Sequence, residues 1–185
     1  LYLGAASGTT VSHVADFAGP TYAVEFAPRP ARDLLDAAEP RDRLFPLLKD
    51  ARRPETYAHV VEADVDVVVQ DVATRGQAAV AARNARFLDD DGRLLLAVKA
   101  RSEDATTEPS DVFAAALAEL GETYEVLATR PLDPYHEDHI GVVAAPRGRR
   151  GPDADRLPAP RRTAVVVTHR LPALPDVDPL DATAL

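Results

Sequence analysis

The chain contains no cysteine, no methionine and no tryptophan, and only Lys49 and Lys99 among its 185 residues are lysines. Without cysteine there is no disulfide framework, no thiolate metal site and no cysteine nucleophile. A cytoplasmic location fits that absence. Long apolar runs are also missing, because none approaches the roughly 18 residues that a membrane-spanning helix needs. We therefore expect neither a disulfide scaffold nor a membrane-spanning segment.

The chain opens on a short apolar segment, Leu1–Leu3, directly before a glycine-containing turn. This segment has the character of the second half of a buried strand. Together with the absence of an initiating methionine, it leads us to expect a fragment that lacks the first elements of its domain.

Acidic residues dominate the charge balance, with 30 Asp and Glu against 21 Lys and Arg and a net charge of −9. An acidic, alanine-rich composition with arginine in place of lysine resembles that of proteins from salt-loving archaea. High net charge favours solubility but does not determine the fold. It argues against a general basic surface for nucleic acid. At molar salt, however, phosphate contacts are screened, so RNA binding would depend on shape and on partners.

Segments with strand character alternate with segments of helical periodicity, which predicts a doubly wound α/β sheet. The expected strands are 1–3, 21–26, 44–48, 65–70, 93–98, 124–129 and 139–145. The expected helices are 9–18, 32–38, 56–62, 77–88 and 111–120, with an acidic turn at 89–92. We assign residues 1–146 to this domain. Residues 147–185, rich in Pro and Arg, are expected to be a mostly disordered extension with at most one edge strand at 163–168.

Ligands of such sheets bind at the carboxyl ends of the strands. The first candidate there is the loop LGAASGTT, Leu3–Thr10. Gly4 and Gly8 allow close backbone approach, the following helix offers free N–H groups, and Thr9 or Thr10 can cap that helix. An ordinary strand–helix turn explains the loop equally well, because a glycine-rich loop alone is a weak signal.

Two acidic residues follow the next strands. Glu25 lies ~20 residues after the loop, where dinucleotide-binding folds place an acid on the ribose hydroxyls. A solvated acid at a strand end is the alternative. The loop lacks a full G-x-G-x-x-G, which favours S-adenosyl-L-methionine (SAM) over a dinucleotide. Asp50 could accept the adenine amino group or, equally, cap a helix before Pro54.

Asp71 and Lys99 each follow a buried strand, and His139 precedes the last one. An acid and an amine at adjacent strand ends can pair, which would orient the lysine for proton abstraction or for stabilising an alkoxide. A purely structural ion pair is the alternative. A histidine at a strand start is more often a packing residue, and the spacing of the histidines matches no metal site.

These motifs resemble one family, the archaeal and eukaryotic fibrillarins. The matching stretches run in family order: Tyr2–Val14 (YLGAASGTTVSHV), Tyr22–Phe26 (YAVEF), Arg32–Leu34 (RDL), Asp50–Pro54 (DAR-P), Val65–Ala73 (VDV---DVA), Val98–Ala100 (VKA) and Asp133–Val143 (DPY--DH--VV).

The resemblance implies a seven-stranded, mostly parallel class I methyltransferase fold with SAM as cofactor and no metal. By this resemblance, the cofactor-binding residues are Gly4, Thr9, Thr10, Glu25, Phe26, Asp50, Ala51, Asp71, Val72, Ala73, Thr74 and Gln77. The family's catalytic set has two lysines, an aspartate and a histidine. Asp71, Lys99 and His139 match three of them, and the other lysine lies upstream of the point where this chain begins. Thr74–Gly76 departs from the family's Gln-Pro-Asp.

The implied activity is 2′-O-methylation of ribose in rRNA, with tRNA as a second target. The implied partners are a box C/D guide RNA, a Nop-type scaffold protein and a kink-turn-binding protein. Two alternatives remain open at this point. One is a small-molecule methyltransferase on the same fold, and the other is a subunit of the particle that has no catalytic role.

Overall fold

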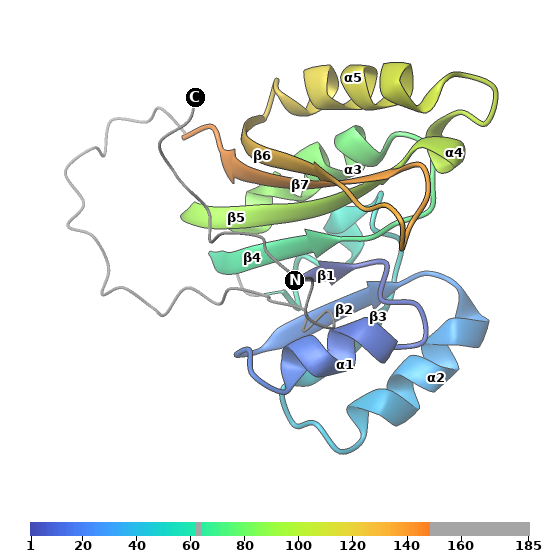
Figure 1. The fold of residues 1–185 in the computed structure, drawn as a ribbon. Coiled ribbons are helices and arrows are strands. Elements are labelled where there is room, and N and C mark those ends of the chain that lie inside the picture. Colours follow the sequence, from blue (N-terminus) through green and yellow to red (C-terminus); the bar gives the residue numbers. More distant parts are fainter. Residues whose placement is uncertain (62–63, 149–185) are drawn as a thin grey trace, which may run out of the picture. The chain divides into compact units, whose positions relative to one another are not determined.

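The computed structural model describes residues 1–61 and 64–148, which form one seven-stranded sheet in the order β3-β2-β1-β4-β5-β7-β6 (Figure 1). The strands are β1 (Tyr2–Leu3), β2 (Thr21–Glu25), β3 (Leu44–Leu48), β4 (Val65–Gln70), β5 (Leu88–Lys99), β6 (Tyr124–Pro131) and β7 (His139–Pro146). The strands β1–β5 pair with one another in parallel, whereas β7 runs antiparallel to both β5 and β6. The predicted doubly wound, mostly parallel sheet is confirmed.

The helices are α1 (Thr9–Ala15), α2 (Pro28–Ala38), α3 (Gln77–Asn84), α4 (Ala100–Glu103) and α5 (Pro109–Leu120), with single 3₁₀ turns at Pro54–Thr56 and Ala85–Phe87. In Figure 1, α1 and α2 lie beside β1–β3, and α3 and α5 lie beside the other half of the sheet. None of the helices in the described ranges combines the length and the apolar character needed to cross a membrane.

Apolar residues on both faces of the central strands form two separate clusters. Tyr2 and Ala23 belong to the cluster with residues of α1 and α2, whereas Leu3 and Val24 belong to the cluster with residues of α3 and α5. Neighbouring residues of a strand point to opposite faces, so this division follows from the twofold period of the strand. Burial on both faces explains why these strands appear in the sequence as continuous apolar runs.

The predicted acidic turn at 89–92 is wrong, because these residues belong to β5. The register between β4 and β5 shifts here, with Val65 opposite Leu88 but Val67 opposite Arg93. The extra residues of β5 are accommodated by this irregularity rather than by a turn that ends the strand.

Several predicted helix boundaries also need correction. The helix expected at 77–88 ends at Asn84 and is followed by a 3₁₀ turn that leads into β5. The helix expected at 56–62 is a single 3₁₀ turn, Pro54–Thr56, and α1 ends at Ala15 rather than at residue 18. Short segments with weak periodicity leave such ends undetermined. The expected extension, including the strand at 163–168, lies outside the described residues from residue 149 onward.

Candidate functional site

The predicted site residues lie along one edge of the sheet. Strand neighbours at that edge pair Leu48 with Glu25, Val24 with Leu3, Leu3 with Gln70, and Gln70 with Leu96. Further along β5, Lys99 pairs with His139. The carboxyl ends of the parallel strands therefore present, in order, the segments that begin at Asp50, at Glu25, at Gly4 and at Asp71, followed by Lys99.

The loop after β1 is a tight turn that depends on two glycines in the left-handed region. Gly4 has φ +83° and Gly8 has φ +88°. The N–H groups of Gly4 and Ala5 donate to the carbonyl oxygen of Val24 at 2.9 and 3.1 Å. A Cβ atom on Gly4 would overlap the carbonyl oxygen of Asp71. The loop thus packs against the end of β4 at a distance that only glycine permits.

Thr9 and Thr10 do not cap α1, so that prediction is wrong. Gly8 is the N-cap residue and α1 has no side-chain cap, because both threonines already lie inside the first helical turn. Their side chains are exposed, and Thr9 Oγ1 lies 3.4 Å from Ser7 Oγ. Both side chains therefore lie at the surface where α1 begins.

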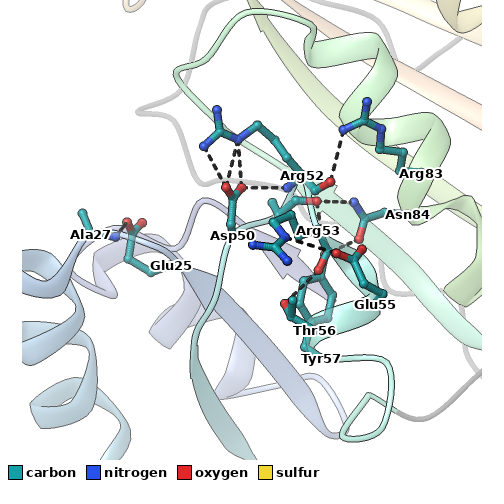
Figure 2. A network of polar contacts seen from close by, with 11 residues as sticks. Glu25, Ala27, Asp50, Arg52, Arg53, Glu55, Thr56, Tyr57, Arg83 and Asn84 are labelled. Atoms are coloured by element: carbon teal, nitrogen blue, oxygen red, sulfur yellow. Dashed lines mark hydrogen bonds and ion pairs between the residues drawn. The ribbon is translucent and has the colours of Figure 1, made fainter.

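Glu25 is buried, with 7% of its surface exposed, so it is not a solvated acid at a strand end. Its Oε2 accepts a hydrogen bond from the N–H of Ala6 at 2.9 Å. Its Oε1 accepts one from the N–H of Ala27 at 2.7 Å (Figure 2). The carboxylate thereby ties the β1–α1 loop to the start of α2. A carboxylate accepts about four hydrogen bonds, so acceptor capacity remains for a ligand. Phe26, which follows it, is 67% exposed.

Asp50 forms a local ion pair with Arg52 after β3 (Figure 2). Arg52 donates to the carboxylate from its backbone N–H at 2.9 Å and from Nη2 at 2.7 Å. These bonds hold the pKa of Asp50 below its ordinary value. Asp50 does not cap a helix, since the N-cap residue of the following 3₁₀ turn is Arg53.

The backbone of Ala51 is held by two buried side chains, Tyr57 and Asn84, which are labelled in Figure 2. The carbonyl oxygen of Ala51 accepts a hydrogen bond from Asn84 Nδ2 at 2.9 Å. The single hydroxyl proton of Tyr57 is donated to Asn84 Oδ1 at 2.5 Å, and Tyr57 Oη lies 3.3 Å from the carbonyl oxygen of Ala51. Tyr57 and Asn84 are both fully buried. The segment that we call the adenine turn, Asp50–Arg52, is therefore supported from the protein interior.

Asp71 and Lys99 form an ion pair between neighbouring strands, with Lys99 Nζ 2.8 Å from Asp71 Oδ1. The lysine side chain is 20% exposed and the aspartate side chain 44% exposed, so the pair is open to a ligand. Tyr2 is buried next to it. Burial, and secondly the negative charge of Asp71, raise the pKa of Tyr2 to about 12. The sequence analysis did not single out Tyr2.

His139 begins β7 and is half-buried. Its Nδ1 lies 2.5 Å from the carbonyl oxygen of Glu137. A carbonyl only accepts, so Nδ1 carries a proton and donates to it; in a neutral ring, Nε2 would then be the acceptor. The ring of His136 lies 5.5 Å from that of His139.

The segment after β4 leads from Asp71 to α3. Val72 is buried, Ala73 is exposed and Thr74 is half-buried. Gln77, predicted to border the cofactor, is fully buried, and its side-chain amide is bonded to the backbone of Lys99. Its contact with a cofactor stays a prediction, whereas its contact with the lysine backbone is present in the structure.

The seven-stranded, mostly parallel sheet, with a glycine-containing turn after β1, a buried acid at the end of β2 and an acid–amine pair at the ends of β4 and β5, has the class I SAM-dependent methyltransferase fold. The fibrillarin family model matches residues 1–148, and the chain belongs to this family.

Among its relatives, the "Fibrillarin-like rRNA/tRNA 2'-O-methyltransferase" of Halorubrum lacusprofundi is 80% identical over 147 residues, which are 80% of this chain and 69% of the relative. A solved fibrillarin of Aeropyrum pernix with natively bound SAM is 50% identical, with a TM-score of 0.70 over 78% of this chain and 64% of that one. A solved fibrillarin/Nop5p complex contains a chain that is 42% identical, with a TM-score of 0.75 over 78% of this chain and 70% of that one.

Proposed function

We propose that residues 1–146 are the methyltransferase domain of an RNA 2′-O-methyltransferase. It transfers the methyl group of SAM to a ribose 2′-hydroxyl of rRNA, and of tRNA as a second target. The observation that carries this proposal is the pair of Asp71 and Lys99, joined at 2.8 Å on the ligand-binding edge of the sheet. A charged pair left open at the end of two buried strands is suited to act on a hydroxyl group.

The residues along this edge fit SAM in chemical type. The ribose diol can donate to the spare acceptor sites of Glu25, whose buried position preorganises the carboxylate. The exposed ring of Phe26 offers an apolar surface to the adenine. Asp50 can accept from the adenine amino group, and the hydroxyls of Thr9 and Thr10 face the methionine end. Gly4, Ala51, Asp71, Val72, Ala73 and Thr74 complete the proposed cofactor contacts, whereas the side-chain amide of Gln77 is already bonded to the backbone of Lys99.

Bound SAM supplies a methyl group on a sulfonium that leaves as a neutral thioether, so no metal is required. The residues of this chain then orient the acceptor. The Lys99 ammonium, held by Asp71, stabilises the negative charge that develops on the 2′-oxygen. Nε2 of His139 is an acceptor for the hydroxyl proton. Holding the oxygen in line with the methyl carbon accounts for much of the acceleration.

Recognition of RNA must come from elsewhere, because a chain with net charge −9 offers no general basic surface. We propose that a box C/D guide RNA selects the nucleotide by base pairing within a cytoplasmic particle. A Nop-type scaffold, as in the solved fibrillarin/Nop5p complex, and a kink-turn-binding protein complete the particle.

Lys99→Ala tests the proposal. In a particle reconstituted with guide RNA, the variant is expected to lose transfer, measured by nucleotide-resolved mapping of 2′-O-methylation. Calorimetry is expected to show SAM affinity within about twofold of the parent chain, since Lys99 acts on the acceptor. Transfer to small molecules alone would establish the small-molecule methyltransferase instead. Absence of SAM binding by the parent chain would establish a subunit without catalysis.

A further inference from the structure

Helix α3 carries a fully buried amide side chain at each end, Gln77 as its first residue and Asn84 as its last. They are seven positions apart, which is about two turns of an α-helix, so both side chains lie on one face. Burial of an amide is costly unless its donors and acceptors are satisfied. Both side chains are bonded, and each is bonded to a different side of the proposed site.

Gln77 holds the backbone of Lys99 at two points. Its Oε1 accepts from the N–H of Lys99 at 2.9 Å, and its Nε2 donates to the carbonyl oxygen of Lys99 at 3.0 Å. The pairing of β5 with β4 ends at Leu96, opposite Gln70, so Lys99 extends beyond its parallel neighbour. The amide of Gln77 takes the place of the backbone that β4 no longer provides.

Gln77 is itself fixed by its surroundings. Glu103 in α4 accepts hydrogen bonds from the N–H groups of Gly76 and Gln77, at 2.8 and 2.5 Å. Gln70 Nε2 donates to the carbonyl oxygen of Gln77 at 2.8 Å. The backbone of Gln77 is therefore held in place. Because the side chain of Gln77 is bonded to Lys99, the end of β5 is held in place as well.

Asn84 acts at the other end of the helix (Figure 2). Its Nδ2 donates both to the carbonyl oxygen of Ala51 in the adenine turn and to that of Val80 within α3, each at 2.9 Å. Its Oδ1 accepts from Tyr57 Oη. The adenine turn is thus attached to the same rigid helix that holds the lysine.

We propose that Gln77 and Asn84 are positioning residues with separable tasks. Gln77 places the Lys99 ammonium opposite Asp71 and governs the transfer step, whereas Asn84 places the adenine turn and governs SAM affinity. The inference rests on the proposed function, because it assigns these tasks to the same site.

The chain contains only two lysines, so lysine labelled with ¹³C gives one Cε signal from Lys99 and one from Lys49. Lys49 follows β3 and is exposed, which makes its signal an internal reference. Gln77→Met keeps the length of the side chain and removes both hydrogen bonds. We expect it to shift the Lys99 signal alone, to lower kcat at least about tenfold, and to leave SAM affinity within about twofold.

Asn84→Leu is expected to do the reverse. SAM affinity, measured by calorimetry, weakens about fivefold or more because the adenine turn loses its support. The Lys99 signal and kcat at saturating SAM stay unchanged. Val80→Ala is the matched control, since Val80 lies on α3 with 2% exposure and its side chain belongs to the apolar core. Val80→Ala is expected to lower the melting temperature without shifting the Lys99 signal and without weakening SAM affinity.

The inference is overturned if Val80→Ala reproduces both effects, or if the two amide variants act alike. It is also overturned if Gln77→Met weakens SAM binding while the Lys99 signal stays in place, which would make Gln77 a cofactor contact. If a variant does not fold, Gln77→Glu and Asn84→Asp replace it, each keeping an acceptor. Failure of the proposed function is distinguishable, because the parent chain would then not bind SAM or Lys99→Ala would still transfer.

Discussion

The two sides of the proposed site are built differently. On the transfer side, Asp71 and Lys99 stand at the ends of paired strands, and the lysine backbone is held by the fully buried Gln77. On the adenine side, Asp50 lies on a turn, paired with an arginine side chain that is 51% exposed. The backbone of that turn is held from within, and its two charged side chains pair with each other at the surface. The acid–amine pair is thus placed at the ends of two neighbouring strands, whereas the proposed adenine acceptor lies on a turn.

Asp71→Asn tests the transfer side and should have the largest effect. The substitution keeps the shape but removes the charge that orients the ammonium, so transfer should fall by about a hundredfold or more. SAM affinity, measured by calorimetry, should change far less. Asp50→Asn is the control on the other side of the site, and it should retain kcat at saturating SAM. Equal losses of kcat in both variants would erase the distinction between the two sides.

Gly4→Ala tests the tight turn after β1, which lies between the two sides of the site. The new Cβ would meet the carbonyl oxygen of Asp71, at a residue whose φ is +83°. We expect a loss of about 2–4 kcal/mol in the free energy of unfolding, measured by urea titration. Gly19→Ala is the matched control, because no atom lies within 4 Å of its added Cβ. An equal loss of unfolding free energy in Gly19→Ala would show that the close approach of Gly4 to Asp71 does not cause the effect.

Asp50→Ala and Arg52→Ala sharpen the account of the adenine side. Removing the proposed acceptor should weaken SAM binding about tenfold, which corresponds to about 1.4 kcal/mol. Removing Arg52 should change SAM affinity less than threefold, since an exposed ion pair contributes about 0–1 kcal/mol. Calorimetry on both variants checks this order. A larger effect of Arg52→Ala would mean that the arginine, not the carboxylate, holds the ligand.

Alkaline pH should produce the smallest effect. The pKa of Tyr2 is raised to about 12 by burial and by Asp71. The folded state therefore keeps the phenol proton that the unfolded chain loses near pH 10. The resulting contribution to stability is fully present below pH 10 and is lost as the pH rises to about 12. Between pH 9 and 11, Tyr2→Phe should lose about 1 kcal/mol less stability than the parent chain in urea titrations. Equal losses of stability in Tyr2→Phe and in the parent chain would show that the hydroxyl of Tyr2 does not make this contribution.

The pattern of apolar and polar residues along the sequence was sufficient to predict much of the fold. The alternation of apolar strands with periodic helices predicted the sheet, and strand ends predicted which residues share its edge. Asp71 and Lys99 could be paired in advance because their strands are neighbours. The turn expected at 89–92 failed because acidic residues favour turns locally, whereas β4 pairs with Leu88 before them and with Arg93 after them, so they belong to β5.

The supports of the site could not be predicted in this way. Gln77 contacts a residue 22 positions away, Glu103 contacts one 26 positions away, and Asn84 contacts one 33 positions away. No periodicity encodes such distances. The one available signal was two amide residues seven positions apart in an alanine-rich helix, which indicates a buried polar face but not its partners. The threonines were assigned to the cap because their residue type favours it, although the positive φ of Gly8 places the cap one residue earlier.

The most direct test follows the methyl group itself. The chain would be labelled on lysine, saturated with SAM carrying a ¹³C-methyl group, and examined for nuclear Overhauser contacts from that methyl. Our account predicts a contact to the side chain of Lys99 and none to Lys49, because the methyl group faces the open pair on β4 and β5. A methyl group that contacts Lys49, or that lies beside neither lysine while SAM is fully bound, would contradict it.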